Sequence, residues 1–199
     1  MVPREKRKQL LDEQGFLLLP GFTSPTELDE LDQRIKQLLE QEGDRAGSEF
    51  KQEPYSRRLS NLINKGEIFR RLAGQPAILD LVQLVLGEHY KLSSMNARSA
   101  NPRQPGGQPL HADMAAIADD QGAWVCNIIW LVNDFTPDNG CLRLVPGSHQ
   151  WRTLPQDSME DPLHLHPEEI HLTAQRGALI VLNAHVWHAG TANQTDHPR

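Results

Sequence analysis

The second half of the chain is a succession of short apolar or alternating segments, and this pattern restricts the possible folds more than any other feature. Gly, Pro, Asn and Asp separate the segments, so each is bounded by residues that favour turns. Several short strands at this spacing are typical of a sandwich or a jelly roll, whose mouth is lined by inward-facing side chains. The expected strands are residues 90–98, 108–114, 124–133, 141–145, 170–173, 178–183 and 186–191.

The first half of the chain is dominated by helical signals. Residues 15–19 form one short apolar strand candidate. A helix is then expected to start at Ser24, with Glu27 closing a capping box and leucines following at helical spacing. A second helix is expected to open at Pro76 and to end at Gly87.

Residues 42–57 are polar and without periodicity, so they form either a mobile loop over an active-site mouth or an exposed connector. No internal repeat or low-complexity tract divides the chain, and 199 residues can bury one sizeable core. We therefore expect a single domain over residues 1–199. Its fold class is mainly β, with N-terminal helices that buttress a double-stranded β-helix of the jelly-roll, cupin-like type.

Composition and charge exclude several classes of protein. The net charge of -6 argues against a nucleic-acid partner, which would require a basic face. No apolar run approaches about 18 residues, so no membrane span is expected, and the basic start lacks the apolar stretch of a signal peptide. Cys126 and Cys141 fall in apolar stretches, which favours buried reduced thiols over a disulfide. These features predict a cytoplasmic protein.

The strongest chemical signal is His111-Ala112-Asp113, with further histidines far downstream. Residues two apart on an extended strand project to the same face, so His111 and Asp113 can reach one metal ion while a third ligand arrives from a distant strand. Two imidazoles and one carboxylate leave half of an octahedron open, as in non-heme Fe(II) oxygenases. A lone pair of this kind is weak evidence, so the context decides.

The third ligand has two candidates, His185 and His188. Three residues apart on an extended strand, they face opposite sides, so only one of them can point into a barrel. His149 lies in a Pro-Gly-Ser-His turn, where a structural role with a side-chain hydrogen bond is favoured over metal binding. A group of three histidines could hold zinc, but the Pro, Glu and Asp residues around them favour a solvated loop. These are His164, His166 and His171.

The motifs around the candidate ligands resemble those of one family as a set. They are Leu110 before His111, Asn139-Gly140-Cys141-Leu142, Pro146-Gly147-Ser148-His149, Trp187-His188-Ala189-Gly190 and Arg199. The set resembles the phytanoyl-CoA dioxygenase family of Fe(II)- and 2-oxoglutarate-dependent oxygenases, from Gly15 to the last residue. The resemblance selects His188 over His185, because His188 is followed by small residues and then Asn193.

The resemblance also implies cofactors and a reaction. His111, Asp113 and His188 would hold Fe(II), whose open positions take 2-oxoglutarate and dioxygen. A small organic molecule or an acyl derivative would be hydroxylated, with release of succinate and CO2. Asp113 favours hydroxylation, since relatives that halogenate lack this carboxylate. No basic cluster for CoA is evident, so phytanoyl-CoA itself is not expected as the substrate.

In the family an arginine lies eleven residues beyond the distal histidine, and Arg199 occupies that position here. Its guanidinium suits the distal carboxylate of 2-oxoglutarate. Because related chains continue past this arginine with further strand, we expect the sequence to be truncated at its C-terminal end. A terminal carboxylate on Arg199 would otherwise neutralise the guanidinium.

Four more side chains are weaker candidates for contacts with 2-oxoglutarate: Gln108, Trp130, Thr191 and Asn96. Trp130 is equally explained as core, and Asn96 as polarity at a strand edge. Two other functions stay open at this point. One is a cupin-like metalloenzyme that does not use 2-oxoglutarate, and the other is a non-catalytic relative that uses the fold as a binding module.

Overall fold

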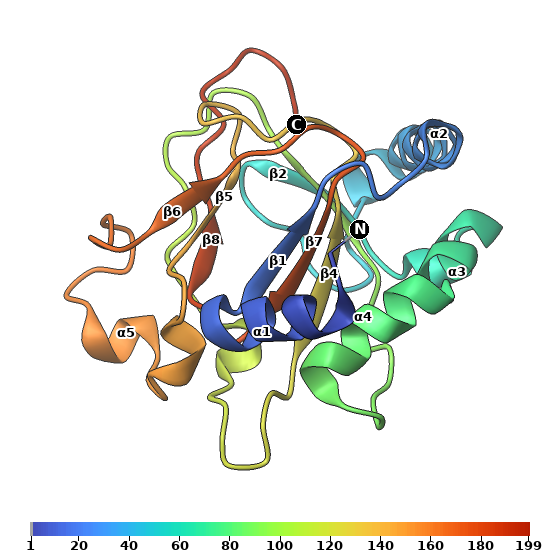
Figure 1. The fold of residues 1–199 in the computed structure, drawn as a ribbon. Coiled ribbons are helices and arrows are strands. Elements are labelled where there is room, and N and C mark those ends of the chain that lie inside the picture. Colours follow the sequence, from blue (N-terminus) through green and yellow to red (C-terminus); the bar gives the residue numbers. More distant parts are fainter. Residues whose placement is uncertain (1) are drawn as a thin grey trace.

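The computed structural model describes residues 2–199. Two three-stranded antiparallel sheets enclose the main core, and a two-stranded ribbon lies beside them (Figure 1). The first sheet has the order β1 (Phe16–Leu19), β7 (Leu179–Asn183), β4 (Cys126–Trp130). The second has the order β6 (Ile170–Leu172), β5 (Leu142–Leu144), β8 (His188–Gly190). The ribbon pairs β2 (Ser56–Leu59) with β3 (Ala97–Ala100).

The main core fills the space between the two three-stranded sheets. Ile180 and Leu182 of β7 belong to the same buried cluster as Leu142 and Leu144 of β5. Because side chains alternate along a strand, the other residues of β7 face outward. These include Leu179 and Val181, which pack against helices instead.

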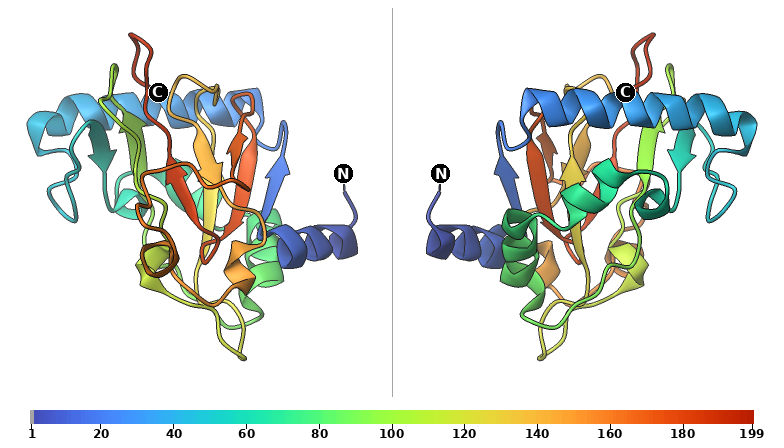
Figure 2. Two further views of the ribbon diagram at one scale, coloured as in Figure 1. Left: turned by 90° about the vertical axis from the view of Figure 1, so that its left-hand side faces the viewer. Right: turned by 90° about the vertical axis from the view of Figure 1, so that its right-hand side faces the viewer.

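Two helices, α1 (Arg4–Gln14) and α4 (Pro76–Leu86), cover the outer face of the first sheet (Figure 2). Leu11 and Leu81 pack against the outward residues of β7 and β4. The helices are α1 (Arg4–Gln14), α2 (Pro25–Glu42), α3 (Glu67–Ala73), α4 (Pro76–Leu86) and the short α5 (Pro155–Ser158). The short 3-10 turns are η1 (Gly43–Arg45), η2 (Leu62–Asn64), η3 (Asp113–Ala115) and η4 (Ser148–Gln150).

The expected helix boundaries agree with the structure. The Ser24 hydroxyl accepts a hydrogen bond from the Glu27 N–H at 3.3 Å and thus caps α2. Gly87 follows α4 with a φ of 76°, a conformation that glycine adopts readily. The helix α1 was not expected, because it is polar on most sides and Leu11 is its one buried residue among those described.

Two of the expected strands are wrong in part. In the segment 90–98 the strand begins only at Ala97, since the residues before it are mostly exposed and belong to no strand ladder. In the segment 108–114, His111 makes a single bridge to His188 before the chain turns into η3. The polar segment 42–57 contains η1 and the first residues of β2.

Within residues 2–199, no helix is both long enough and apolar enough to cross a membrane. Both cysteines are free thiols, as expected. Cys141 lies in the core between the sheets, whereas Cys126 packs on the outer face. Burial raises the pKa of the Cys126 thiol to about 12.

Candidate metal centre

The structure brings together His111, Asp113 and His188. Asp113 Oδ1 lies 3.8 Å from His111 Nε2, and Asp113 Oδ2 lies 3.7 Å from His188 Nε2. One ligand atom from each side chain lies within 4.8 Å of the others, and residues 2–199 contain no second cluster of this kind. Two atoms that bind one ion at about 2.1 Å can be at most about 4.2 Å apart. Both carboxylate–imidazole distances are therefore short enough for a shared ion.

Backbone hydrogen bonds place the two histidines side by side. The His111 N–H donates to the His188 carbonyl at 3.0 Å, and the His188 N–H donates to the His111 carbonyl at 2.9 Å. Asp113 is held separately, because its N–H donates to the Ala184 carbonyl at 2.9 Å. The same-face strand geometry expected for His111 and Asp113 is not what joins them, since Asp113 already lies in η3.

The same imidazole nitrogen is left free on both histidines. His111 Nδ1 contacts the Pro109 carbonyl at 2.9 Å, and His188 Nδ1 contacts the Val186 carbonyl at 2.7 Å. A carbonyl oxygen can only accept, so each Nδ1 carries the proton and each Nε2 keeps its lone pair. Burial, and then the nearby His111, lower the pKa of His188 to about 4. His188 is therefore neutral at neutral pH, which is the form that binds metals.

Asn127 was missed by the sequence reasoning. Its side-chain amide donates to Asp113 Oδ2 from the inner face of β4. Such a contact fixes the orientation of a ligating carboxylate. A signal was present in the sequence, because Asn127 is the one amide in the otherwise apolar strand Cys126–Trp130.

His185 lies in the turn before β8, and both of its ring nitrogens contact backbone. Its Nδ1 donates to the Ala116 carbonyl at 2.9 Å, and its Nε2 accepts from the Trp124 N–H at 2.8 Å. His149 contacts the Asp12 carbonyl through Nε2 at 3.0 Å, which agrees with a structural role. Burial lowers the pKa of His149.

The downstream histidine group does not form a metal cluster within residues 2–199. His164 and His171 are exposed and approach the carboxylates of Asp161 and Glu169 respectively. His166 packs its ring near Trp151. The expected solvated loop therefore describes most of this segment.

The weaker co-substrate candidates occupy different surroundings. Gln108 lies beside β8, where its side-chain oxygen accepts from the Gly190 N–H at 3.0 Å. The Thr191 hydroxyl donates to the Cys141 carbonyl at 3.2 Å. Asn96 donates to the Ser94 hydroxyl at 3.1 Å.

Trp130 does not lie beside the metal centre's carboxylate. It shares the outer face of β4 with Cys126, opposite to Asn127, because side chains alternate along the strand. Its ring packs among the apolar residues beneath the helices. The core alternative therefore fits this residue.

Arg199 is tied to the turn that follows Phe135. Its guanidinium lies 4.2 Å over the Phe135 ring and donates to the backbone carbonyls of Asn139 and Gly140. Gly140 in this turn has a φ of 86°, a conformation that glycine adopts readily.

The charge of Arg199 has no carboxylate partner within residues 2–199. Burial, and then the nearby charge of Arg98, lower the pKa of Arg199 to about 10. A half-buried guanidinium without a carboxylate partner is stabilised by any anion that can reach it.

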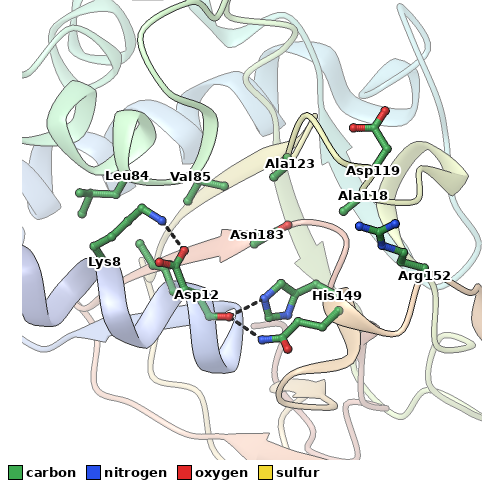
Figure 3. A pocket seen from close by; sticks show the side chains of 13 residues that line it. Lys8, Asp12, Leu84, Val85, Ala118, Asp119, Ala123, His149, Arg152 and Asn183 are labelled. Atoms are coloured by element: carbon green, nitrogen blue, oxygen red, sulfur yellow. Dashed lines mark hydrogen bonds and ion pairs between the residues drawn. The ribbon is translucent and has the colours of Figure 1, made fainter.

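A cavity of about 370 Å³ lies away from the metal centre (Figure 3). Its walls come from α1, α4, the turn at His149 and the segment that follows η3. None of the three candidate ligands lines it.

Comparison with known sequences decides the family. The phytanoyl-CoA dioxygenase (PhyH) family matches residues 11–199. The chain belongs to this family. The resemblance drawn from the sequence motifs is thereby confirmed.

The individual relatives of the chain are distant. The dioxygenase af480 of Aspergillus fumigatus is 27% identical, over 94% of this chain and 60% of its own length. The Fe(II)/2-oxoglutarate-dependent dioxygenase nvfF of Aspergillus novofumigatus is 26% identical, over 94% of this chain and 66% of its own length. The chain thus spans about three fifths of the first of these relatives.

The fold also matches solved structures. One is EctD from S. alaskensis with 2-oxoglutarate and 5-hydroxyectoine, which is 21% identical with a TM-score of 0.79. The match covers 98% of this chain and 72% of EctD.

Proposed function

We propose that this PhyH chain is an Fe(II)- and 2-oxoglutarate-dependent dioxygenase that hydroxylates a small organic molecule or an acyl derivative. The observation that carries the proposal is the meeting of two imidazole Nε2 atoms and one carboxylate at His111, His188 and Asp113. This donor set fits ferrous iron and leaves half of an octahedron for co-substrate and dioxygen. Family membership supports the same reading.

The residues of the chain would hold and orient the metal. The Nδ1–H groups of His111 and His188 fix the ring planes through backbone carbonyls. Asn127 fixes one oxygen of Asp113. When bound, iron with 2-oxoglutarate and dioxygen supplies the oxidising power, and succinate and CO2 are released. Because Asp113 occupies the third protein position, no site is free for a halide, which supports hydroxylation.

Arg199 is the proposed partner of the distal carboxylate of 2-oxoglutarate. The guanidinium has five N–H donors, and two backbone carbonyls accept from it. Its remaining donors and its uncompensated charge suit a carboxylate. Gln108 and Thr191, which flank the end of β8, are further proposed contacts.

We further infer that the two facing sheets form a double-stranded β-helix. The buried cluster shared by β5 and β7 supports this arrangement. The TM-score of 0.79 with EctD supports it as well.

The test is succinate formation from 2-oxoglutarate in air with Fe(II), with and without candidate substrates. We expect slow succinate release by the wild-type protein alone and faster release with a substrate. His188→Ala should abolish both, whereas the exposed variant Leu165→Gln should change neither.

Two results would contradict the proposal. Succinate release that persists in His188→Ala would show that His188 does not hold the metal. A wild-type protein that binds iron tightly but never consumes 2-oxoglutarate would favour the cupin-like alternative.

A further inference from the structure

Residues 114–124, here called the flap, protrude from the molecule with both ends at the metal centre. The flap starts directly after Asp113 and ends three residues before Asn127, which donates to Asp113. Figures 1 and 2 show it as the yellow segment that extends beyond the helices and sheets. A bridge between Asp119 and Gly122 closes its tip.

The flap exposes three large apolar side chains. Met114 is 83% exposed, Trp124 is 55% exposed and Ile117 is 41% exposed. Contact of such side chains with water is unfavourable, so they gain free energy when an apolar surface covers them. Solvent-exposed clusters of this kind commonly mark binding sites.

The metal centre is open on the side from which the flap departs. The side chains of His111 and Asp113 are 37% and 31% exposed, whereas that of His188 is 8% exposed. An iron centre of the proposed type works best when bulk water is excluded. Some group must therefore cover His111 and Asp113 during the reaction.

His185 forms hydrogen bonds with residues near both ends of the flap. Its imidazole is buried, donates to the Ala116 carbonyl and accepts from the Trp124 N–H. Because His185 belongs to the turn just before His188, this pair of hydrogen bonds holds the flap next to the metal ligands.

The flap is loosely packed on its other side. The cavity of about 370 Å³ separates Ala118 and Ala123 of the flap from Leu11 and Leu84 of the helices (Figure 3). Side chains do not fill this space, so the flap can shift without a steric conflict. Beyond the contacts at Ala116 and Trp124, one exposed ion pair, Asp120–Arg152 at 2.6 Å, joins the flap to a neighbouring segment. An exposed pair of this kind contributes little stability, so the flap can adjust to a molecule that binds against it.

We propose that Met114, Ile117 and Trp124 lie against an apolar substrate at the open face of the metal centre, with His185 as the residue that positions the flap. The inference rests on the proposed function and names its substrate class. The substrate presents a large apolar surface, and a strongly polar solute does not fit. Apolar contact buries the flap residues and excludes water from the centre at the same time.

The first experiment measures binding of the neutral apolar dye N-phenyl-1-naphthylamine to the protein loaded with Ni(II) and 2-oxoglutarate. The variants are Met114→Gln, Trp124→Gln and the two combined. Leu165→Gln is the matched control, because Leu165 is equally apolar and 72% exposed on another loop. The dissociation constant of the dye should rise about tenfold in the combined variant, and by less than about twofold in the control.

Unchanged binding in the combined variant overturns the proposal, as does an equal loss in Leu165→Gln. The single variant Met114→Gln separates a loss of binding from misfolding. Met114 is 83% exposed, so its replacement should leave the fold intact and should still raise the dissociation constant of the dye.

The second experiment measures hydrogen exchange of the Trp124 amide, which donates to His185. His185→Ala should accelerate this exchange by about tenfold or more and weaken dye binding, while Ni(II) affinity stays within about threefold. His185→Gln should slow the exchange again in part, since its amide oxygen can accept the same hydrogen bond.

A purely structural role of His185 would instead accelerate exchange throughout the neighbouring strand β7, and that outcome overturns the positioning role. Failure of the proposed function looks different. It appears as Ni(II) affinity that survives His188→Ala, whereas the dye and exchange results depend on the flap alone.

Discussion

Asn127→Leu offers a sharp test of how the metal centre is held together. Asn127 is the one side chain within residues 2–199 that donates a hydrogen bond to the Asp113 carboxylate. Leucine has the same branching and the same number of side-chain heavy atoms but no donor, so the strand keeps its side-chain shape while Asp113 loses its orientation. A hydrogen bond to a charged group contributes about 1.5–3 kcal/mol. Converted at about 1.4 kcal/mol per factor of ten, this predicts a rise of roughly 10- to 100-fold in the dissociation constant of the metal.

The assay is anaerobic titration of the protein with Fe(II), and with Ni(II) as a redox-inert substitute, followed by calorimetry. Asn64→Leu is the control, because Asn64 donates to Asn61 at the surface, away from the candidate ligands. Thermal unfolding of each variant separates a loss of metal affinity from a loss of folding. A metal affinity in Asn127→Leu within twofold of wild type, at an unchanged melting temperature, would refute the role assigned to this amide.

Three further outcomes are expected. His188→Ala should lose Ni(II) binding by more than about 100-fold in the same titration, whereas His185→Ala should retain it, because both nitrogens of His185 already contact backbone. Arg199→Ala should raise the KM for 2-oxoglutarate about 100-fold in a succinate assay without altering metal affinity, and Arg199→Lys should recover only part of this loss. Burial alone would favour the neutral acid, but the hydrogen bond and charge of Arg98 lower the pKa of Glu53 from 4.5 to about 2. Its stabilising contribution is thus complete above about pH 4.5 and is lost as the pH falls toward 2, so urea unfolding should show a smaller acid loss of stability in Glu53→Gln than in wild type.

Local signals in the sequence predicted the helices and turns that depend on local chemistry. The cap at Ser24 and the positive φ of Gly87 are properties of single residues, so they can be recognised without knowledge of tertiary contacts. The helix α1 lacks such a signal, because its stability comes from packing Leu11 against α4 and β7. Packing partners that lie far away in the sequence leave no local pattern.

The segment 108–114 shows a second limit. Its alternating sequence predicted a strand, but His111 is the one residue of the segment that forms a β-bridge, to His188. Strand pairing depends on where β8 ends, and the local sequence of residues 108–114 carries no information about that position. The structure nevertheless brings His111 and Asp113 together, because the Asp113 N–H donates to the turn before β8.

Asn127 and Trp130 illustrate how strand alternation can distinguish a site residue from a core residue. Both residues lie on β4, and an odd spacing of three residues places them on opposite faces. If one of the two residues faces the metal centre, the other must therefore face away from it. A buried amide requires a polar partner, whereas an indole ring packs well among aliphatic side chains. The sequence therefore favours Asn127 over Trp130 as the residue of this strand that faces a polar site. The period-two rule alone then assigns Trp130 to the core beneath the helices, where the structure has it.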